Sequence, residues 1–306
     1  MIPIQINHLK KAFAGTQAVN DISFAVHQGE IFGLIGPDGA GKTTTIRILV
    51  SLLTADAGQV LFKGRAVHKN MAFVRSQIGY MPQRFSLYQD LSVEENMHFF
   101  GDLFKVTRYE QKERMQRLFS FSNLEPFRKR RAAALSGGMK QKLALSCMLM
   151  HDPEVVVLDE PTYGVDPVSR NEFWNILKML SEQGTSILVT TAYMDEAELC
   201  NRVGLIFKGR LLAHDEPQKL TNHFDHPLYL IDSDQSNKLY DALQQTPFAG
   251  DCHLFGEGIH LTDRQKRGMH AVRTILDEQK IDYRSIKPIT PDMEDLFLEL
   301  MQDAKN

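Results

Sequence analysis

Short apolar runs alternate with segments of helical periodicity along most of the chain. The runs at residues 31–35, 155–158 and 186–190 are apolar on both faces, which is typical of strands in the middle of a parallel sheet. Helical periodicity follows at residues 43–53 and 171–181. Strands that alternate with helices predict a mainly parallel, doubly wound α/β sheet.

Two other regions of this part have different patterns. Residues 4–26 predict two short strands around a turn at residues 14–16. A helical region from about residue 84 to residue 150 predicts a separate small subdomain. The helices expected there are residues 93–104, 109–119 and 138–150.

A turn-rich stretch at about residues 222–227 predicts a boundary between a first domain, 1–222, and a second domain, 227–306. The sequence of the second domain predicts elements in the order βαββαβ, followed by a helix at residues 293–301. This order is typical of a ferredoxin-like α+β arrangement. Thr290 is expected to cap that helix, with Pro291 as its first residue. The preceding elements are expected at residues 228–231, 236–244, 253–255, 259–261, 267–278 and 283–288, with a hairpin turn across residues 256–258.

Composition and charge describe an ordinary globular protein. The 306 residues are 24% charged and 43% hydrophobic, with a net charge of -3, so a basic nucleic-acid-binding face is not expected. The basic run at residues 128–131 favours a solvated helix end, with a docking surface as the alternative. The three cysteines lack CxxC spacing, so we expect neither a disulfide framework nor a zinc site. We expect Cys147 to be a buried core thiol and the chain to reside in a reducing cytosol.

Residues 36–43 carry the main candidate chemistry, because they match the GxxxxGK[ST] phosphate-binding pattern between a strand and a helix. Glycines there allow backbone N–H groups and the positive helix end to converge on phosphate oxygens. Lys42 is expected to reach the β- and γ-phosphates of ATP, and Thr43 to coordinate Mg²⁺. The carboxylate of Asp38 would repel a polyphosphate, so we expect it to point into solvent. The expected ATP-binding residues of this loop are Gly36, Pro37, Asp38, Gly39, Ala40, Gly41, Lys42, Thr43 and Thr44.

Two adjacent acids, Asp159 and Glu160, end an apolar strand, where a buried carboxylate needs a compensating partner. Asp159 is expected to hold Mg²⁺ through its water shell, together with Thr43. Glu160 is the candidate general base for the water that attacks the γ-phosphate. A pair of surface acids is the alternative interpretation.

A second anion site is predicted where Ser136, Gly137 and Gly138 open a helix. The segment offers a hydroxyl, bare backbone amides and a favourable dipole end. Because the first loop already holds one triphosphate, the second site is expected to meet another nucleotide. A plain helix cap is the alternative interpretation.

Taken in order from residue 4 to about residue 220, these segments resemble the nucleotide-binding subunit of an ATP-binding cassette (ABC) transporter. The resemblance implies a P-loop NTPase core, ATP and Mg²⁺ as cofactors, and Glu160, Gln83 and Lys42 as catalytic residues. It implies a head-to-tail dimer, homomeric or heteromeric, in which each signature at residues 136–138 covers ATP held by its partner. It also implies that Phe13 stacks on adenine, that Gln83 contacts Mg²⁺ and the attacking water, and that Asp166 crosses the dimer interface.

One position departs from the family. Ala192 stands where the family usually has a histidine, and the neighbouring Thr190 and Thr191 fix the register. Alanine has no donor for the γ-phosphate, and the loss of such a donor costs on the order of 10²–10³-fold in rate. We therefore expect the site to bind ATP well and to turn over slowly, unless Tyr193 or a water molecule substitutes. His214 follows a further strand and is not a natural replacement.

The second domain resembles the C-terminal extension of bacterial drug-resistance-type exporter ATPases, with an acidic-aromatic helix at residues 294–300, which implies a role in dimer contacts or regulation. No apolar run approaches the roughly 20 residues that cross a bilayer, and no signal-peptide pattern is present. The sequence thus predicts the ATP-hydrolysing subunit of an exporter that drives efflux through separate integral membrane permease subunits, at the cytoplasmic face of the inner membrane. The alternatives are a soluble cassette ATPase acting on ribosomes or DNA, and an ATP-gated regulator with a slow site in a heterodimer.

Overall fold

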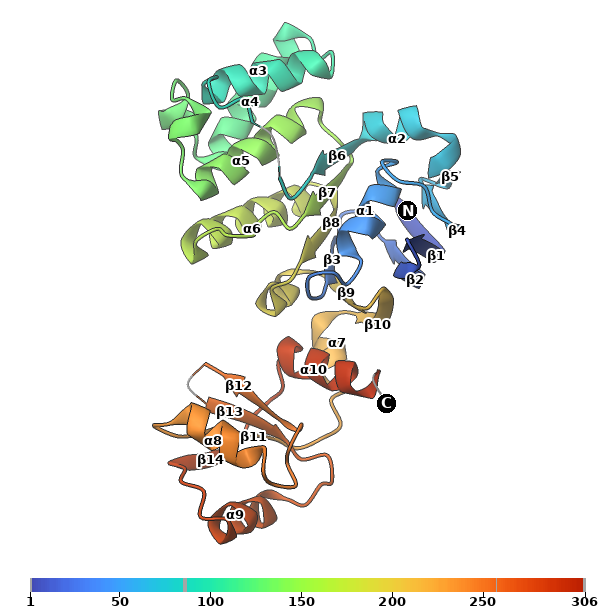
Figure 1. Cartoon of the computed structure of the whole chain (residues 1–306). Coiled ribbons are helices and arrows are strands. Elements are labelled where there is room, and N and C mark those ends of the chain that lie inside the picture. The colour runs from blue at the N-terminus through green and yellow to red at the C-terminus, as the bar shows by residue number, and fades with distance from the viewer. Residues whose placement is uncertain (1, 85–86, 257, 305–306) are drawn as a thin grey trace. The chain divides into compact units, whose positions relative to one another are not determined.

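The structure is a computed structural model that describes residues 2–84, 87–256 and 258–304 (Figure 1). The chain divides into two compact units, Met1–Pro217 and Gln218–Asn306. Among the described residues, no helix combines the length and the apolar character needed to cross a bilayer.

A six-stranded sheet forms the centre of the first unit. Its strands are β3 (Ile31–Ile35), β6 (Ile78–Met81), β7 (Val155–Asp159), β8 (Ser186–Thr191), β9 (Arg202–Phe207) and β10 (Arg210–Asp215). They lie in the order β10-β9-β3-β8-β7-β6, all parallel except β10 at the edge. Every residue of β3, β7 and β8 is buried. The prediction of a mainly parallel α/β sheet is confirmed.

A second, antiparallel sheet of the first unit has the order β2-β1-β4-β5. It is formed by β1 (Ile4–Phe13), β2 (Thr16–Val26), β4 (Ala57–Phe62) and β5 (Arg65–Ala66). The two N-terminal strands and the turn between them are confirmed, but the prediction that the strands are short was wrong, because β1 and β2 have 10 and 11 residues. Register shifts between them, with His8 and Asp21 at positive φ, interrupt the alternation that marks a long strand. The strands β4, β5, β6 and β10 were not predicted.

Two helices of the first unit pack on the central strands of the six-stranded sheet. Helix α1 (Lys42–Leu49) follows β3 and packs on β7, and α6 (Pro167–Glu182) packs on β3 and β8. Helix α6 begins earlier than predicted, because Asp166 caps it and Pro167 takes its first position, where a missing N–H costs nothing. A shorter helix, α2 (Met71–Gln77), precedes β6.

The helical subdomain consists of α3 (Val93–Leu103), α4 (Arg108–Ser122) and α5 (Gly137–Met148), which pack on one another (Figure 1). Capping boxes start α3 and α4, and the side chain of Ser136 caps α5. Cys147 is fully buried on α5, as predicted.

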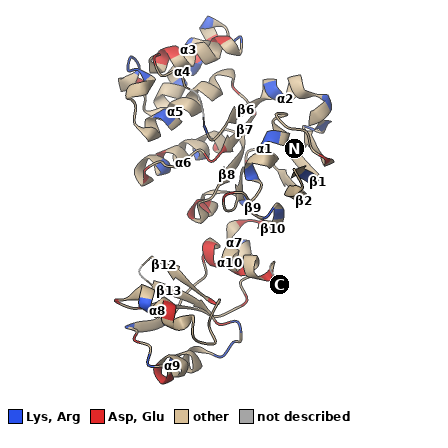
Figure 2. Cartoon of the chain, in the orientation of Figure 1, with Lys and Arg blue, Asp and Glu red and all other residues tan. Residues whose placement is uncertain are grey.

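The basic run at residues 128–131 is exposed and follows the 3-10 helix Glu125–Phe127. Its first residue, Arg128, pairs with Glu94 at the start of α3. Basic and acidic segments are scattered over both units (Figure 2).

The second unit is built on a four-stranded antiparallel sheet of order β12-β13-β11-β14. Helices α8 and α9 share one apolar core with this sheet, which includes Ile231, Leu243 and Leu276. This topology is the predicted ferredoxin-like arrangement. The predicted hairpin turn includes Glu257, which lies outside the described residues. The elements are β11 (Leu228–Asp232), α8 (Ser236–Leu243), β12 (Cys252–Phe255), β13 (Gly258–Thr262), α9 (Met269–Glu278) and β14 (Ser285–Pro288), preceded by α7 (Pro217–Thr221).

The last helix, α10 (Met293–Asp303), begins differently from its prediction. Asp292, and not Thr290, is the cap, and its carboxylate accepts hydrogen bonds from the backbone N–H groups of Glu294 and Asp295. Pro291 therefore precedes the helix. A carboxylate that satisfies two free N–H groups and meets the positive helix end is a stronger cap than the hydroxyl that we had predicted.

Candidate functional site

Close backbone contacts shape the loop between β3 and α1. A Cβ at Gly36 would lie 2.1 Å from the carbonyl oxygen of Ile206, and one at Gly41 would lie 2.3 Å from that of Ala18. Gly41 also has a φ of 108°, in the region that favours glycine. Packing therefore requires glycine at both positions, independently of any ligand.

Lys42, the first residue of α1, is buried and has three hydrogen-bonding partners. Its ammonium donates to the carbonyl oxygens of Gly36 at 2.6 Å and Pro37 at 3.0 Å, and it lies 3.0 Å from Oε1 of Glu160. An ammonium has three N–H donors, so all of them are engaged in this structure. Any phosphate that Lys42 binds must replace some of these partners.

Asp159 ends β7 and is almost completely buried, with 1% of its surface exposed. Its Oδ1 accepts hydrogen bonds from the hydroxyls of Thr43 at 3.0 Å and Thr190 at 2.9 Å. Burial raises the pKa of Asp159 above its ordinary value, although both hydroxyl groups act in the opposite direction. A carboxylate and a hydroxyl at this separation are hard oxygen donors of the kind that Mg²⁺ accepts, so the residues present fit the ion.

Glu160 has a φ of 50°, which is uncommon for a residue other than glycine and typical of functional sites. Its backbone N–H donates to the carbonyl oxygen of Thr190, at 3.1 Å. The side-chain amide of Gln83 donates to Oε2 at 2.9 Å, while Lys42 holds Oε1. The carboxylate is thus fixed between Lys42 and Gln83.

Lys42, Thr43, Gln83 and Glu160 border a cavity of ≈ 450 Å³, whereas Asp159 lies outside its described lining. Most of the predicted phosphate-binding loop (the P-loop, residues 36–43) meets Gln83 and Glu160 there, and Asp38 is exposed. Gly36 and Pro37 are not among the described residues that line the cavity. Ala18, Arg84 and Tyr163 also line the cavity, and sequence reasoning missed them. The described residues that line it are Ala18, Asp38, Gly39, Ala40, Gly41, Lys42, Thr43, Thr44, Gln83, Arg84, Glu160 and Tyr163.

The second predicted anion site lies at the start of α5. Ser136 is exposed, and its hydroxyl accepts a hydrogen bond from the N–H of Met139 at 3.3 Å. Gly137 is exposed, whereas Gly138 is buried against α6. Among the described residues, those lining the P-loop cavity do not include this segment.

Comparison with known proteins decides the family. Residues 19–163 match the family described as ABC transporter. The chain is 32% identical over 303 residues to the linearmycin resistance ATP-binding protein LnrL of Bacillus subtilis, and covers 97% of both chains. This chain belongs to the ATP-binding subunits of ABC transporters. That family consists of ATPases coupled to transport.

Two further comparisons place the cassette among its relatives. It is 39% identical over 305 residues to the "Probable multidrug ABC transporter ATP-binding protein YbhF" of Escherichia coli. The match covers 98% of this chain and 52% of YbhF, so the chain spans about half the length of that relative. The dimeric structure of the ATP-binding cassette MJ0796 bound to ADP and Pi has a TM-score of 0.63 and 22% identity, covering 70% of this chain and 98% of that one, which shows the shared fold.

Ala192, where the resemblance implies a histidine, follows the end of β8. Ala192 is half-buried and directly follows Thr191, the last residue of β8. The ring of the next residue, Tyr193, lies against Arg170, with 4.8 Å between the guanidinium carbon and the ring centroid. Tyr193 is absent from the described residues that line the P-loop cavity. This arrangement therefore does not support the idea that Tyr193 takes the role of the histidine.

Two residues that the resemblance singled out lie outside the cavity as described. Phe13 ends β1 with 46% of its surface exposed, and the ammonium of Lys11 lies 5.4 Å from its ring centroid. Asp166 is exposed and caps α6 by accepting a hydrogen bond from the N–H of Ser169, which lowers its pKa. Their roles toward adenine and a partner cassette remain predictions.

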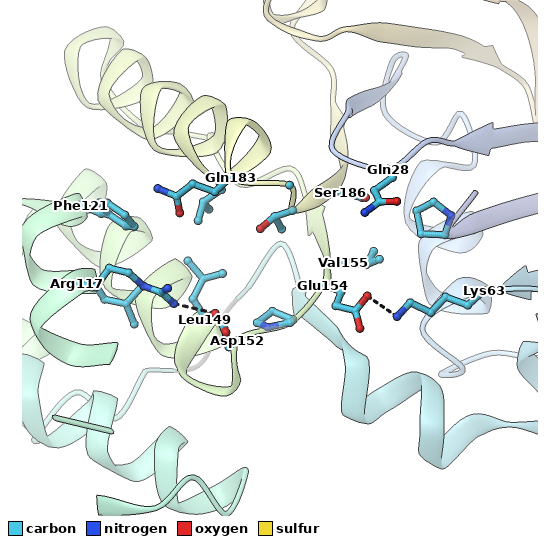
Figure 3. Close-up of a pocket in the computed structure, with 16 residues that line it drawn as sticks. Gln28, Lys63, Arg117, Phe121, Leu149, Asp152, Glu154, Val155, Gln183 and Ser186 are labelled. Atoms are coloured by element: carbon cyan, nitrogen blue, oxygen red, sulfur yellow. Dashed lines mark hydrogen bonds and ion pairs between the residues drawn. The ribbon is translucent and has the colours of Figure 1, made fainter. Parts of the chain in front are cut away.

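The P-loop cavity is smaller than two others in the cassette. A cavity of ≈ 580 Å³ is lined by Val155 and Ser186, the first residues of β7 and β8, whereas Asp159 and Thr191 end those strands. Figure 3 shows the two ion pairs at its wall, Arg117 with Asp152 and Lys63 with Glu154. A third cavity, of ≈ 710 Å³, lies beside the loop that follows α1. Cavity size alone does not point to the predicted nucleotide site, because the predicted phosphate-binding residues line the smallest of the three.

Gly138 has a packing role that can be tested. A Cβ there would lie 2.3 Å from the Cβ of Ser169, whereas a Cβ at Gly137 would meet no atom within 4 Å. Gly138→Ala is therefore expected to lower the free energy of unfolding by about 1–3 kcal/mol, as overpacking does. Urea unfolding of both variants measures this. Gly137→Ala is the matched control, and equal stability of the two variants would contradict the close contact between α5 and α6.

Proposed function

We propose that this chain binds and hydrolyses ATP and thereby drives export through separate membrane permease subunits. The observation that carries the proposal is the position of Glu160, whose carboxylate is held by Lys42 and Gln83 at the wall of the P-loop cavity. A buried carboxylate with fixed orientation beside the phosphate-binding loop suits a general base.

The chemistry follows from groups already in place. The loop binds the triphosphate, and Lys42 exchanges its bond to Glu160 for phosphate oxygens. Water then attacks the γ-phosphorus, the bond to the β–γ bridging oxygen breaks, Glu160 takes the water proton, and ADP leaves with phosphate. Thr43 and Asp159 are the residues that would hold Mg²⁺, which supplies charge neutralisation at the phosphates when bound.

The signature supports a dimer. Ser136 and Gly137 are exposed at the start of a 12-residue helix, where N–H groups and the helix dipole attract anions. A second copy, or a different cassette, can place its nucleotide there. Asp166, exposed at the start of α6, is proposed to lie at the same interface.

The helical subdomain offers a surface for the membrane partner. Tyr88 and Phe99 are 47% and 37% exposed, and their ring centroids lie 4.3 Å apart. Leu103, the last residue of α3, and Phe104 after it are also exposed apolar residues. A permease bound to this surface would place the chain at the cytoplasmic face of the inner membrane. Export, rather than import, is supported by the names of LnrL and YbhF, which refer to linearmycin resistance and to multidrug transport.

A second function is favoured by Ala192. Without a histidine donor the chain's own site would retain ATP, close the dimer and hydrolyse slowly, so that the chain would act mainly as a regulator of a faster partner cassette. Its Ser136 would then complete the fast site.

The proposed function is tested with the full chain and with the proteins that co-purify with it. We expect Mg²⁺-dependent phosphate release from ATP, which Lys42→Ala abolishes, and co-purification with an integral membrane protein. A partner cassette that raises the rate sharply would favour the regulatory function. Absence of ATP binding by the parent chain would overturn both.

A further inference from the structure

Arg84 is a basic residue of the nucleotide cavity that has no role so far. It directly follows Gln83, lines the cavity with Thr43 and Glu160, and is exposed. Among the residues that the structure describes, no hydrogen bond or ion pair engages its guanidinium. A free guanidinium at the wall of a phosphate-binding cavity is available for a ligand.

The charge balance of the cavity points to an anion for Arg84. Of the described residues that line it, two are cationic, Lys42 and Arg84, and two are carboxylates, Asp38 and Glu160. The buried carboxylate of Asp159 lies behind Thr43 and adds negative charge. Without Arg84 the site would present a single cation against three carboxylates to a strongly anionic ligand.

Arg84 and Lys42 differ in availability. All three donors of the Lys42 ammonium are engaged by Glu160 and two carbonyl oxygens. A guanidinium offers a planar pair of donors that matches two phosphate oxygens, and Arg84 brings it without breaking an existing bond to any described residue.

The position of Arg84 in the chain indicates that its partner is the γ-phosphate. The amide of Gln83 lies 2.9 Å from Oε2 of Glu160, the proposed base for attack on the γ-phosphorus. Consecutive Cα atoms are about 3.8 Å apart, so Arg84 starts beside this end of the nucleotide and has a long side chain with which to reach it. The resemblance implies a donor to the same phosphate at position 192, where this chain has Ala192.

We propose that Arg84 binds the γ-phosphate of ATP held in this cavity, at the end of the nucleotide that Ala192 leaves without a donor. The proposal rests on the proposed function, because it needs ATP in the P-loop. Arg84 thereby keeps selectivity for ATP over ADP in a site that lacks the histidine.

The experiment compares binding of AMP-PNP, a non-hydrolysable ATP analogue, with binding of ADP by calorimetry. For Arg84→Gln we expect about tenfold weaker binding of AMP-PNP, because a charge-assisted hydrogen bond to the γ-phosphate is lost. Binding of ADP, which has no γ-phosphate, should be unchanged. Arg84→Lys, which keeps the charge, should recover part of the loss. Arg75→Gln is the matched control, because Arg75 on α2 bonds to Ser51 outside the cavity.

The outcomes separate this proposal from the function on which it rests. Equal weakening of AMP-PNP and ADP, or no change in either, overturns the role of Arg84 while leaving ATP binding by the parent intact. A parent chain that binds neither nucleotide contradicts the proposed function itself. In an Ala192→His background, Arg84→Gln should weaken AMP-PNP binding less than it does in the parent. Equal weakening in both backgrounds would contradict the proposal that Arg84 binds the phosphate for which position 192 supplies no donor.

Discussion

Glu160→Gln is expected to lower the rate of phosphate release about 10²–10⁴-fold, the contribution typical of a general base. Glutamine keeps the shape of the side chain and an oxygen that accepts from Gln83 or Lys42, so the cavity should survive. It also removes the charge that holds Lys42 at 3.0 Å, which frees the ammonium for phosphate. We therefore expect ATP to bind but to persist, and the ATP-bound dimer to accumulate in gel filtration.

Glu154→Gln is the matched control for this experiment. Glu154 pairs with Lys63 near the opposite end of β7 and is exposed. Its replacement should leave the rate of phosphate release within twofold of the parent. A Glu160→Gln variant that hydrolyses ATP at the parental rate would remove Glu160 from the mechanism. A variant that stays monomeric with ATP would contradict the head-to-tail dimer for this chain alone.

The sequence located the centre of the site because the chemistry there is local in the chain. The P-loop occupies consecutive residues between a strand and a helix, and Asp159 ends β7 with Glu160 directly after it. Parallel strands bring their carboxyl ends to one edge of the sheet, so these segments could be expected to meet. Their meeting, with Gln83, is what the structure shows.

Partners that depend on strand order could not be predicted in this way. Thr190 bonds to Asp159 because β7 and β8 are neighbours in this register, in which Asp159 lies opposite Thr190. A polar residue at the end of a buried strand was the available signal. Arg84 carried no such signal, because its place in the cavity depends on the path of the chain after β6.

For the fold too, elements with a clear local sequence pattern were predicted, and those with an interrupted or ambiguous pattern were not. Buried strands such as β3 were predicted because all their residues are apolar. The length of β1 was underestimated, since bulges interrupt its alternation. The cap of α10 was misplaced because both Thr290 and Asp292 precede the helix, and Asp292 is the cap because it accepts hydrogen bonds from two N–H groups.

Ala192→His is expected to raise the rate of phosphate release on the order of 10²-fold, which reverses the loss of one preorganised donor. Position 192 is half-buried directly after β8, which is the neighbour of β7 in the sheet, and Asp159 and Glu160 lie at the end of β7. An imidazole there can donate to the γ-phosphate as charge develops on it. Phosphate release at saturating MgATP measures the change, with AMP-PNP affinity as the check on binding.

Ala192→Phe separates the donor from the size of the side chain, because phenylalanine fills similar space without an N–H group. It should leave the rate at or below that of the parent. Equal rates for Ala192→His and the parent, with AMP-PNP binding intact, would show that hydrolysis is not limited at this position. The result also bears on Arg84, since a guanidinium that already binds the γ-phosphate leaves less for histidine to add. The gain should therefore be larger in the Arg84→Gln background than in the parent, whereas two independent donors would give the same gain in both.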